Sequence, residues 1–342
     1  MTLLSHRAAP CTGLLLLCAM GCRPAATADA PVDPGFTYAA DHHMHLGSAD
    51  LCGRLPPEEP CGKYRTPLSV LAEDAVRALD AAHVGKGTVF SAAYLYGMAD
   101  LKIPADSVGY WMRRENEFTA AEVARAPDRL VGVMSVDPLA PTALEEIAHW
   151  KGHPAFRALK MHLFASRVHV ADPAERARLG AVFRAAHEAG FPVVVHVGGA
   201  FFGPAEAELF LREVLPQAGG TPVQVAHGAG AGLPPDGPRH VAVLRTFADQ
   251  IAAHAPGTDS LYFDLSFFVW KEDSTAVAQL VSEMRRIGVE RFLFASDFDV
   301  QTVVEAEARV DSLRLTPEER AVVARSCAPW VCGAEAGAGA SR

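Results

Sequence analysis

Short apolar runs alternate with longer amphipathic stretches over most of the chain, and this alternation restricts the fold more than any other feature. Each run has the length of a strand, and the stretches between runs have helical periodicity. Continuous apolar runs separated by helices indicate parallel strands that are covered on both faces. The predicted strands are Thr37–Asp41, Gly87–Ser91, Leu130–Val136, Ala158–His162, Pro192–Val197, Val223–His227, Leu261–Ser266 and Arg291–Ser296.

Helical patterns fill the intervals between these strands, and one more helix closes the chain. Eight strand–helix units fit a (β/α)8 TIM barrel better than a doubly wound sheet. No linker and no internal repeat interrupts the pattern, so we expect one barrel domain over residues 37–332. The predicted helices are Ser69–Ala82, Ser107–Ala126, Pro141–Trp150, Pro173–Ala189, Pro204–Leu215, Val241–His254, Thr275–Ile287 and Pro317–Ala328.

The first 22 residues are predicted to be a signal peptide rather than part of the fold. A short basic segment precedes an apolar stretch, Gly13–Met20, which is too short to span a bilayer. It ends in Ala19-Met20-Gly21-Cys22, which resembles a bacterial lipoprotein signal with Cys22 as the lipidated residue. Plain secretion is the alternative. Residues 23–36 read as a flexible tether and 333–342 as a disordered tail. The expected location is periplasmic or in the cell envelope.

Cysteine usage agrees with export. Outside the signal the chain has Cys52, Cys61, Cys327 and Cys332, an even number that suits an oxidising compartment. Three connectivities are open, and proximity in sequence favours Cys52–Cys61 and Cys327–Cys332. The segment from Ser48 to Pro67, rich in Pro and charge, would then form a loop pinned by the first pair, where substrate selection is expected.

The charge pattern excludes one large class of partner. The net charge is −9, and basic residues are scattered without interleaved aromatic residues. Nucleic acid is therefore not expected to bind. The expected partner is a small-molecule substrate, and the only expected membrane contact is a lipid anchor at Cys22.

The chemistry-bearing residues stand where the predicted strands end. In Asp41-His42-His43-Met44-His45, the side chains of His43 and His45 share one face of an extended chain, as a pair of zinc ligands would. Catalytic groups of a barrel lie at the C-terminal ends of its strands, and polar residues close several other apolar runs there. These residues are Lys160 and His162 on strand four, His196 on strand five, His227 on strand six and Asp297 on strand eight.

These motifs resemble the amidohydrolase superfamily, and specifically its amidohydrolase-related branch, over about Thr37 to Trp330. Asn116-Glu117, Ala126-Pro127-Asp128-Arg129-Leu130-Val131-Gly132 and Arg291-Phe292-Leu293-Phe294-Ala295-Ser296-Asp297 are similar to segments of that branch. The resemblance implies one divalent metal, expected to be Zn²⁺, and a homodimer. It implies that the metal ligands are His43, His45, His196 and Asp297.

Two residues have catalytic roles implied by the resemblance. His227 would hydrogen-bond the bound water or the developing oxyanion, and Asp297 would shuttle a proton. Three neutral imidazoles leave a position open for water, whose pKa the metal lowers towards about 7. Lys160 is a candidate for substrate binding, and His162 is either a substrate contact or part of the barrel packing. Alternatively Lys160, when carbamylated, bridges a second metal, or it pairs with Asp264 on strand seven.

Three functions are compatible with this reading. The first is a hydrolase of an amide, lactone or other ester that uses a metal-activated water. The second is a non-oxidative, metal-dependent decarboxylase of a small aromatic or unsaturated acid. The third is a surface-anchored binding protein on an inactive barrel, which the presence of every expected ligand disfavours.

Overall fold

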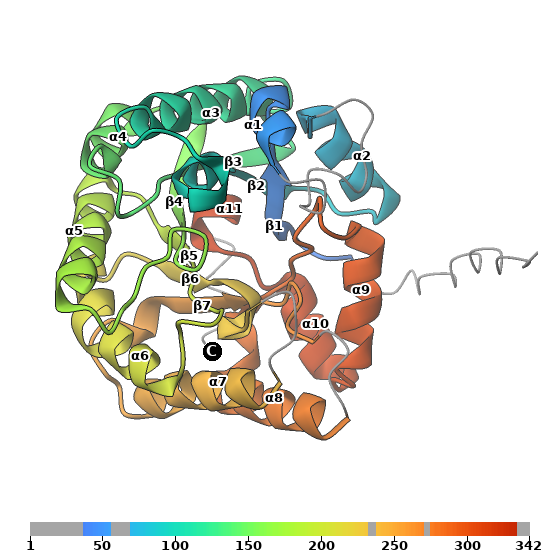
Figure 1. Cartoon of the computed structure of the whole chain (residues 1–342). Coiled ribbons are helices and arrows are strands. Elements are labelled where there is room, and N and C mark those ends of the chain that lie inside the picture. Colours follow the sequence, from blue (N-terminus) through green and yellow to red (C-terminus); the bar gives the residue numbers. More distant parts are fainter. Residues whose placement is uncertain (1–36, 56–68, 232–236, 270–273, 334–342) are drawn as a thin grey trace, which may run out of the picture. The chain divides into compact units, whose positions relative to one another are not determined.

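Eight parallel strands form the centre of the molecule and pair in the order in which they occur in the sequence. The computed structural model describes residues 37–55, 69–231, 237–269 and 274–333. Helices follow the strands and surround them, so that the fold is the predicted (β/α)8 barrel (Figure 1). The strands are β1 (Asp41–Leu46), β2 (Gly87–Ser91), β3 (Leu130–Ser135), β4 (Phe156–His162), β5 (Val193–His196), β6 (Val223–Val225), β7 (Leu261–Asp264) and β8 (Phe292–Leu293).

Helices surround the strands, and α5 illustrates how such a helix begins and ends. In α5, Asp172 accepts hydrogen bonds from the first backbone amides, Pro173 begins the helix and Gly190 ends it with a left-handed backbone. The helices are α1 (Ala49–Arg54), α2 (Ala72–Ala81), α3 (Val108–Val123), α4 (Ala143–Trp150), α5 (Pro173–Ala189), α6 (Pro204–Leu209), α7 (Gly237–Ala252), α8 (Ser274–Ile287), α9 (Val303–Ser312), α10 (Pro317–Arg325) and α11 (Pro329–Cys332).

Shorter helical turns lie in the loops and differ from the predicted helices. The predicted helix Pro204–Leu215 is divided into α6, a π-helical turn and a 3₁₀ turn that contains Pro216. Helices α1, α9 and α11 were not predicted. The turns are η2 (Ala93–Gly97), η3 (Ala99–Leu101), η4 (Phe210–Val214), η5 (Leu215–Ala218), η6 (Ala226–Ala229), η7 (Thr258–Ser260) and η8 (Val289–Arg291).

Strand β1 corrects the expected position of the first strand. The prediction of Thr37–Asp41 was wrong, because β1 begins at Asp41 and runs through both histidines of the motif to Leu46. The strand is buried along most of its length, and its histidines replace the apolar residues that usually mark such a strand. His43 and His45 are therefore fixed by strand hydrogen bonding rather than carried on a loop.

The barrel closes between its first strand and the segment that follows β8. The amide of His42 donates to the carbonyl of Phe294 at 3.0 Å, and the amide of Asp297 donates to the carbonyl of His43 at 2.7 Å. A parallel bridge joins Met44 and Phe298. Residues 294–298 therefore complete the barrel wall without regular strand geometry, and Asp297 is part of that closure.

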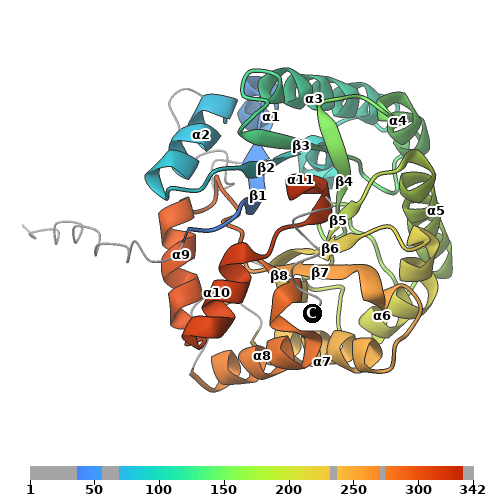
Figure 2. The same cartoon turned by 180° about the vertical axis from the view of Figure 1, so that it is seen from behind.

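The barrel interior is filled by side chains in layers, as is usual for this fold. Phe90, Val133, Ala158 and Val194 form one buried cluster inside the strands, and Trp330 packs against it. Trp330 belongs to α11, which Figures 1 and 2 show within the ring of helices. Cys327 and Cys332 form a disulfide that closes this short C-terminal segment.

Several sequence-based predictions lie outside the described residues. These are the signal peptide 1–22 with Cys22, the tether 23–36, Cys61 with its predicted bond to Cys52, and the tail 334–342. They stay predictions. Among the helices that the structure describes, none is long and apolar enough to cross a membrane.

Candidate metal centre

Two histidines and an aspartate converge at the C-terminal end of the barrel. The Nε2 atoms of His43 and His45 are 3.2 Å apart. The Oδ1 atom of Asp297 lies 3.1 Å from Nε2 of His43 and 3.0 Å from Nε2 of His45. Strand β1 supplies the histidines, and the barrel-closing segment supplies the aspartate. The structure thus brings together three of the four predicted metal ligands.

The protonation of His43 decides what these three atoms can hold. Its Nδ1 lies 3.0 Å from Oδ2 of Asp264, an acceptor, so Nδ1 carries the proton and Nε2 presents a lone pair. That lone pair faces a carboxylate oxygen of Asp297 and the Nε2 atom of His45. Three such atoms this close are held together by a proton or a metal ion between them. The donor set, imidazole nitrogen and carboxylate oxygen, is one that zinc and related metals prefer.

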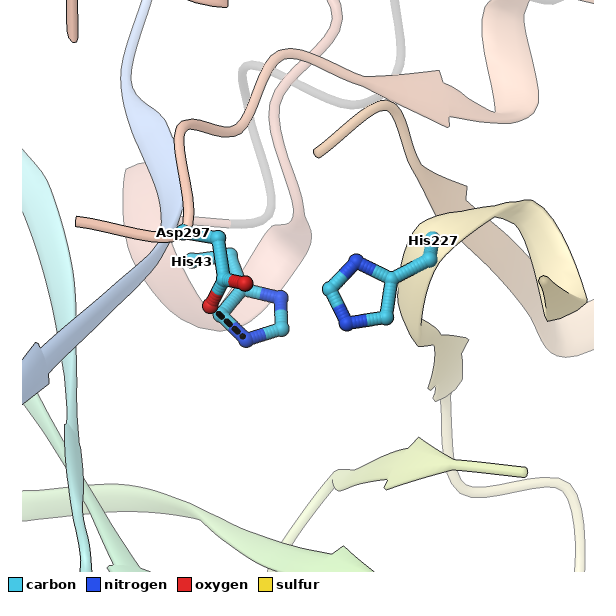
Figure 3. A group of neighbouring side chains, drawn as sticks. All are labelled: His43, His227 and Asp297. Carbon is cyan, nitrogen blue, oxygen red and sulfur yellow. Dashed lines mark ion pairs between the residues drawn. The ribbon is translucent and has the colours of Figure 1, made fainter. Parts of the chain in front are cut away.

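His227 faces the same point from the opposite wall. Its Nδ1 lies 2.8 Å from the carbonyl oxygen of Ser266, to which it donates, and Nε2 is the nitrogen left for the site. One ligand atom each from His43, His227 and Asp297 lies within 4.8 Å of the others. Figure 3 shows the imidazole of His227 opposite the His43–Asp297 pair.

The turn that carries His227 is strained. Turn η6 places His227, Gly228 and Ala229 in the left-handed region, with φ of 55°, 56° and 69°. A Cβ at Gly228 would lie 2.3 Å from the Phe268 side chain, so only glycine fits there. Asp297 also has a positive φ of 59°. Strained backbone of this kind clusters at functional sites, where the surrounding structure holds it.

Asp264 connects the two walls of the site. This fully buried carboxylate, at the end of β7, accepts from Nδ1 of His43, from Gln224 Nε2 at 2.8 Å and from the amide of His227 at 3.0 Å. The hydroxyl of Ser266 donates at 2.5 Å to Oδ1 of Asp264, the same oxygen that accepts from His227. The sequence reading did not assign these histidine partners. The signal was present, because Asp264 also closes an apolar run.

The predicted fourth ligand, His196, lies beside this group. Its ring stacks on that of His162 with centroids 3.8 Å apart, and the His196 and His227 centroids are 4.7 Å apart. The pairing of β4 with β5 places His162 next to His196 in register. Nδ1 of His162 accepts from the amide of Ala165 at 3.2 Å, so its Nε2 carries the proton. Both rings therefore border the cluster.

Lys160 is the buried cation nearest these groups among the described residues. Its side chain is 1% exposed, and its Nζ lies 4.8 Å from the centroid of the Phe90 ring. Burial lowers the pKa of Lys160 to about 8, although the charges of Asp264 and Asp297 act in the opposite direction. A lysine with this pKa is charged at neutral pH and can pair with an anion beside it.

Burial also keeps four of the five histidines at the site neutral. It lowers the pKa of His227 to about 4 and the pKa of His196 and His162 well below the usual value. Burial lowers the pKa of His45 as well. For His43, burial and Lys160 lower the pKa, but Asp264 and Asp297 outweigh them and the net shift is upward. Neutral imidazoles are the form that binds metals.

Comparison with known proteins identifies the family through one family model. A family model described as Amidohydrolase matches residues 40–327. Among curated protein sequences, none matches the chain significantly.

Solved structures of low identity share the barrel. A 5-carboxyvanillate decarboxylase from Novosphingobium aromaticivorans, with manganese and 4-hydroxy-3-methoxy-5-nitrobenzoic acid, is 16% identical, with a TM-score of 0.57 over 84% of this chain and 93% of that chain. An amidohydrolase from Burkholderia multivorans with bound zinc is 15% identical, with a TM-score of 0.57 over 84% and 96%. A 2,6-dihydroxybenzoate decarboxylase from Rhizobium is 14% identical, with a TM-score of 0.55 over 84% and 96%. At these identities the likeness shows the fold alone.

Proposed function

The chain belongs to the amidohydrolase family, and on that premise we propose that it is a metal-dependent enzyme. The observation that carries the proposal is the close approach of Nε2 of His43, Nε2 of His45 and Oδ1 of Asp297, where the neutral His43 ring presents a lone pair. A bound divalent metal would act there as a Lewis acid towards a substrate oxygen. The proposed ligands are His43, His45, His196 and Asp297, with His227 beside them.

The reaction we propose first is non-oxidative decarboxylation of a small aromatic or unsaturated acid. Proteins of similar fold include decarboxylases of 5-carboxyvanillate and 2,6-dihydroxybenzoate, which are aromatic acids. In such a reaction the bond to the carboxylate carbon breaks, CO2 leaves, and the remaining carbon keeps the electron pair and takes a proton. The chain must therefore hold an anion and manage one proton.

Buried groups in the site match these two tasks. Lys160 is the proposed partner of a substrate carboxylate, because it is a buried cation whose neighbours leave it charged at neutral pH. Asp297 and His227 are the proposed proton carriers, because each presents an acceptor atom to the same point. His162, stacked on His196, would contact the substrate.

Hydrolysis of an amide, lactone or other ester is the second candidate, and the state of His227 favours it. With the proton held on Nδ1, its Nε2 can accept a proton from an attacking water. This differs from donating to an oxyanion, which the neutral ring can do only from the nitrogen that Ser266 already occupies. Asp297 would then pass a proton to the leaving group.

One panel separates the two reactions. Aromatic and unsaturated acids are tested for CO2 release, and esters and lactones for acid release, each with Zn²⁺ or Mn²⁺ added. CO2 release that disappears in Lys160→Met supports decarboxylation. Hydrolysis that persists in Lys160→Met but disappears in His227→Ala supports the second candidate. Inactivity of the metal-loaded protein towards both classes would argue against the reaction assignment.

Elemental mass spectrometry tests the metal itself. About one ion per chain supports the proposed site and leaves Lys160 for the substrate. About two ions per chain would favour a carbamylated Lys160 that bridges a second metal and would move the mechanism towards hydrolysis. No metal, even after supplementation, would refute the proposal.

We also propose that the protein is exported and anchored in the cell envelope through Cys22. The support is the sequence Ala19-Met20-Gly21-Cys22 after a short apolar segment. Labelling with a radioactive fatty acid tests this, and Cys22→Ala should abolish the label. The family resemblance also leads us to propose a homodimer, which light scattering on the purified protein tests.

A further inference from the structure

The C-terminal segment, residues 327–332, fills the end of the barrel away from the metal centre; we call it the C-terminal plug. Its Trp330 packs against the interior cluster of Phe90, Val133, Ala158 and Val194. The Trp330 ring also meets Tyr262 edge-on with centroids 5.8 Å apart. The disulfide between Cys327 and Cys332 closes the plug into a single turn. The plug is thus packed into the barrel rather than lying on its surface.

Phe90 belongs to this cluster and also packs against the metal centre. It is fully buried on β2, and its ring lies 4.6 Å from that of His43 and 5.6 Å from that of His45. Nζ of Lys160 lies 4.8 Å from the same ring. The buried cluster on which Trp330 packs therefore includes a ring, Phe90, that contacts two proposed metal ligands and the proposed substrate cation.

A second connection passes through His42. The amide of Ala328, in the plug, donates to Nε2 of His42 at 3.1 Å, and Nδ1 of His42 donates to the carbonyl of Phe294 at 3.0 Å. His42 is next to His43 in β1, and Phe294 lies in the segment that carries Asp297. The His42 ring therefore links the plug to β1 and to the segment that carries Asp297.

We propose that the C-terminal plug is a positioning element of the metal centre: Trp330 supports the buried cluster whose Phe90 ring packs against His43 and His45, and Ala328 holds the strand that carries them. The proposal rests on the metal site proposed above. Protein interiors are close-packed, so a void left by Trp330 would let the cluster relax towards it and draw the Phe90 ring away from the imidazoles. Residues that orient metal ligands typically change metal affinity by 10–100-fold when they are lost.

The test is the affinity for Zn²⁺, measured by chelator competition on the purified protein, together with the melting temperature of the metal-free form. Trp330→Ala should weaken zinc binding by about tenfold or more. Trp330→Phe should stay within about threefold of the wild type. The buried Nε1 of Trp330 has no hydrogen-bond partner among the described residues, so ring packing alone has to be kept.

Two further proteins separate positioning from stability. Cys327→Ser with Cys332→Ser opens the plug and should also weaken zinc binding, by less than Trp330→Ala. Leu179→Ala removes a fully buried side chain from α5 on the outer ring. It should lower the melting temperature of the metal-free protein while zinc affinity stays at the wild-type value. If Trp330→Ala does not fold, Trp330→Leu takes its place.

The outcomes are distinct. Weakened zinc binding in the Trp330 and cysteine variants, rescue in Trp330→Phe and unchanged binding in Leu179→Ala support the proposal. Wild-type zinc affinity in every variant, with only the melting temperatures lowered, overturns it and leaves the proposed function intact. A wild-type protein that binds neither Zn²⁺ nor Mn²⁺ overturns both.

Discussion

Asp264→Asn is the substitution that most directly tests what sets the protonation of the proposed metal ligand His43. Oδ2 of Asp264 accepts from Nδ1 of His43 at 3.0 Å and from Gln224 at 2.8 Å. Oδ1 accepts from the amide of His227 at 3.0 Å and from the hydroxyl of Ser266. Every neighbour donates, so an amide in either orientation turns its NH2 group towards at least two donors.

The size of the effect follows from that mismatch. If the NH2 group faces His43, the imidazole must accept at Nδ1 and carry its proton on Nε2, where a metal would bind. The loss of such an orienting partner costs about 10–100-fold in metal affinity, or roughly 1.4–2.8 kcal/mol. If the NH2 group faces His227 instead, two buried donors lose a charged acceptor, at about 1.5–3 kcal/mol each.

The assay is Zn²⁺ affinity by chelator competition, with thermal unfolding of the metal-free protein beside it. Asp249→Asn is the matched control, because this exposed carboxylate pairs with Arg286 on the outer ring and is remote from the site. It should bind zinc like the wild type. Unchanged zinc affinity and unchanged stability in Asp264→Asn would refute the argument that this carboxylate sets the protonation of His43.

Three further predictions concern other groups. His43→Ala combined with His45→Ala should abolish stoichiometric metal in elemental analysis, and retained metal and activity would sink the ligand assignment. Lys160→Met should raise KM for a carboxylate substrate by about tenfold or more while metal content stays constant; in the wild type, binding of that substrate should weaken as pH rises through about 8, where Lys160 loses its proton. Burial raises the pKa of Glu307 to about 7. A carboxyl whose folded pKa lies above its unfolded value loses stability as pH rises between the two. Glu307→Gln should therefore raise the melting temperature at pH 8 and leave it unchanged near pH 4, and an equal gain at both pH values would contradict this.

Much of the barrel was predictable because most of its strands are short runs of mainly apolar residues. The strands β2 and β3 were placed almost to the residue, since Gly or Pro residues and helix caps bound them. Strand β1 was misplaced because its buried positions are occupied by histidines, which periodicity counts as polar. Helix α11 was not predicted because its four residues are too few to show a helical pattern of apolar positions.

The site was predictable in composition but not in its contacts. Polar residues at strand ends identified His43, His45, His196, His227 and Asp297 as neighbours. The stacking of His162 on His196 and the role of Asp264 depend on side-chain directions across the barrel. Sequence spacing carries no information about these directions, because the paired residues are far apart in the chain.

The closure of the barrel predicts where the protein would begin to unfold when it loses a bound metal. Strand β8 has only two residues, and the hydrogen bonds to β1 come mainly from the irregular segment that bears Asp297. A metal bound by His43 and Asp297 would link the first strand to the segment that follows the last strand. Loss of the metal would then separate β1 from residues 294–298 first, while the other strand pairs stay intact. Amide hydrogen exchange should begin along residues 294–298, and a protease should find its first cut there.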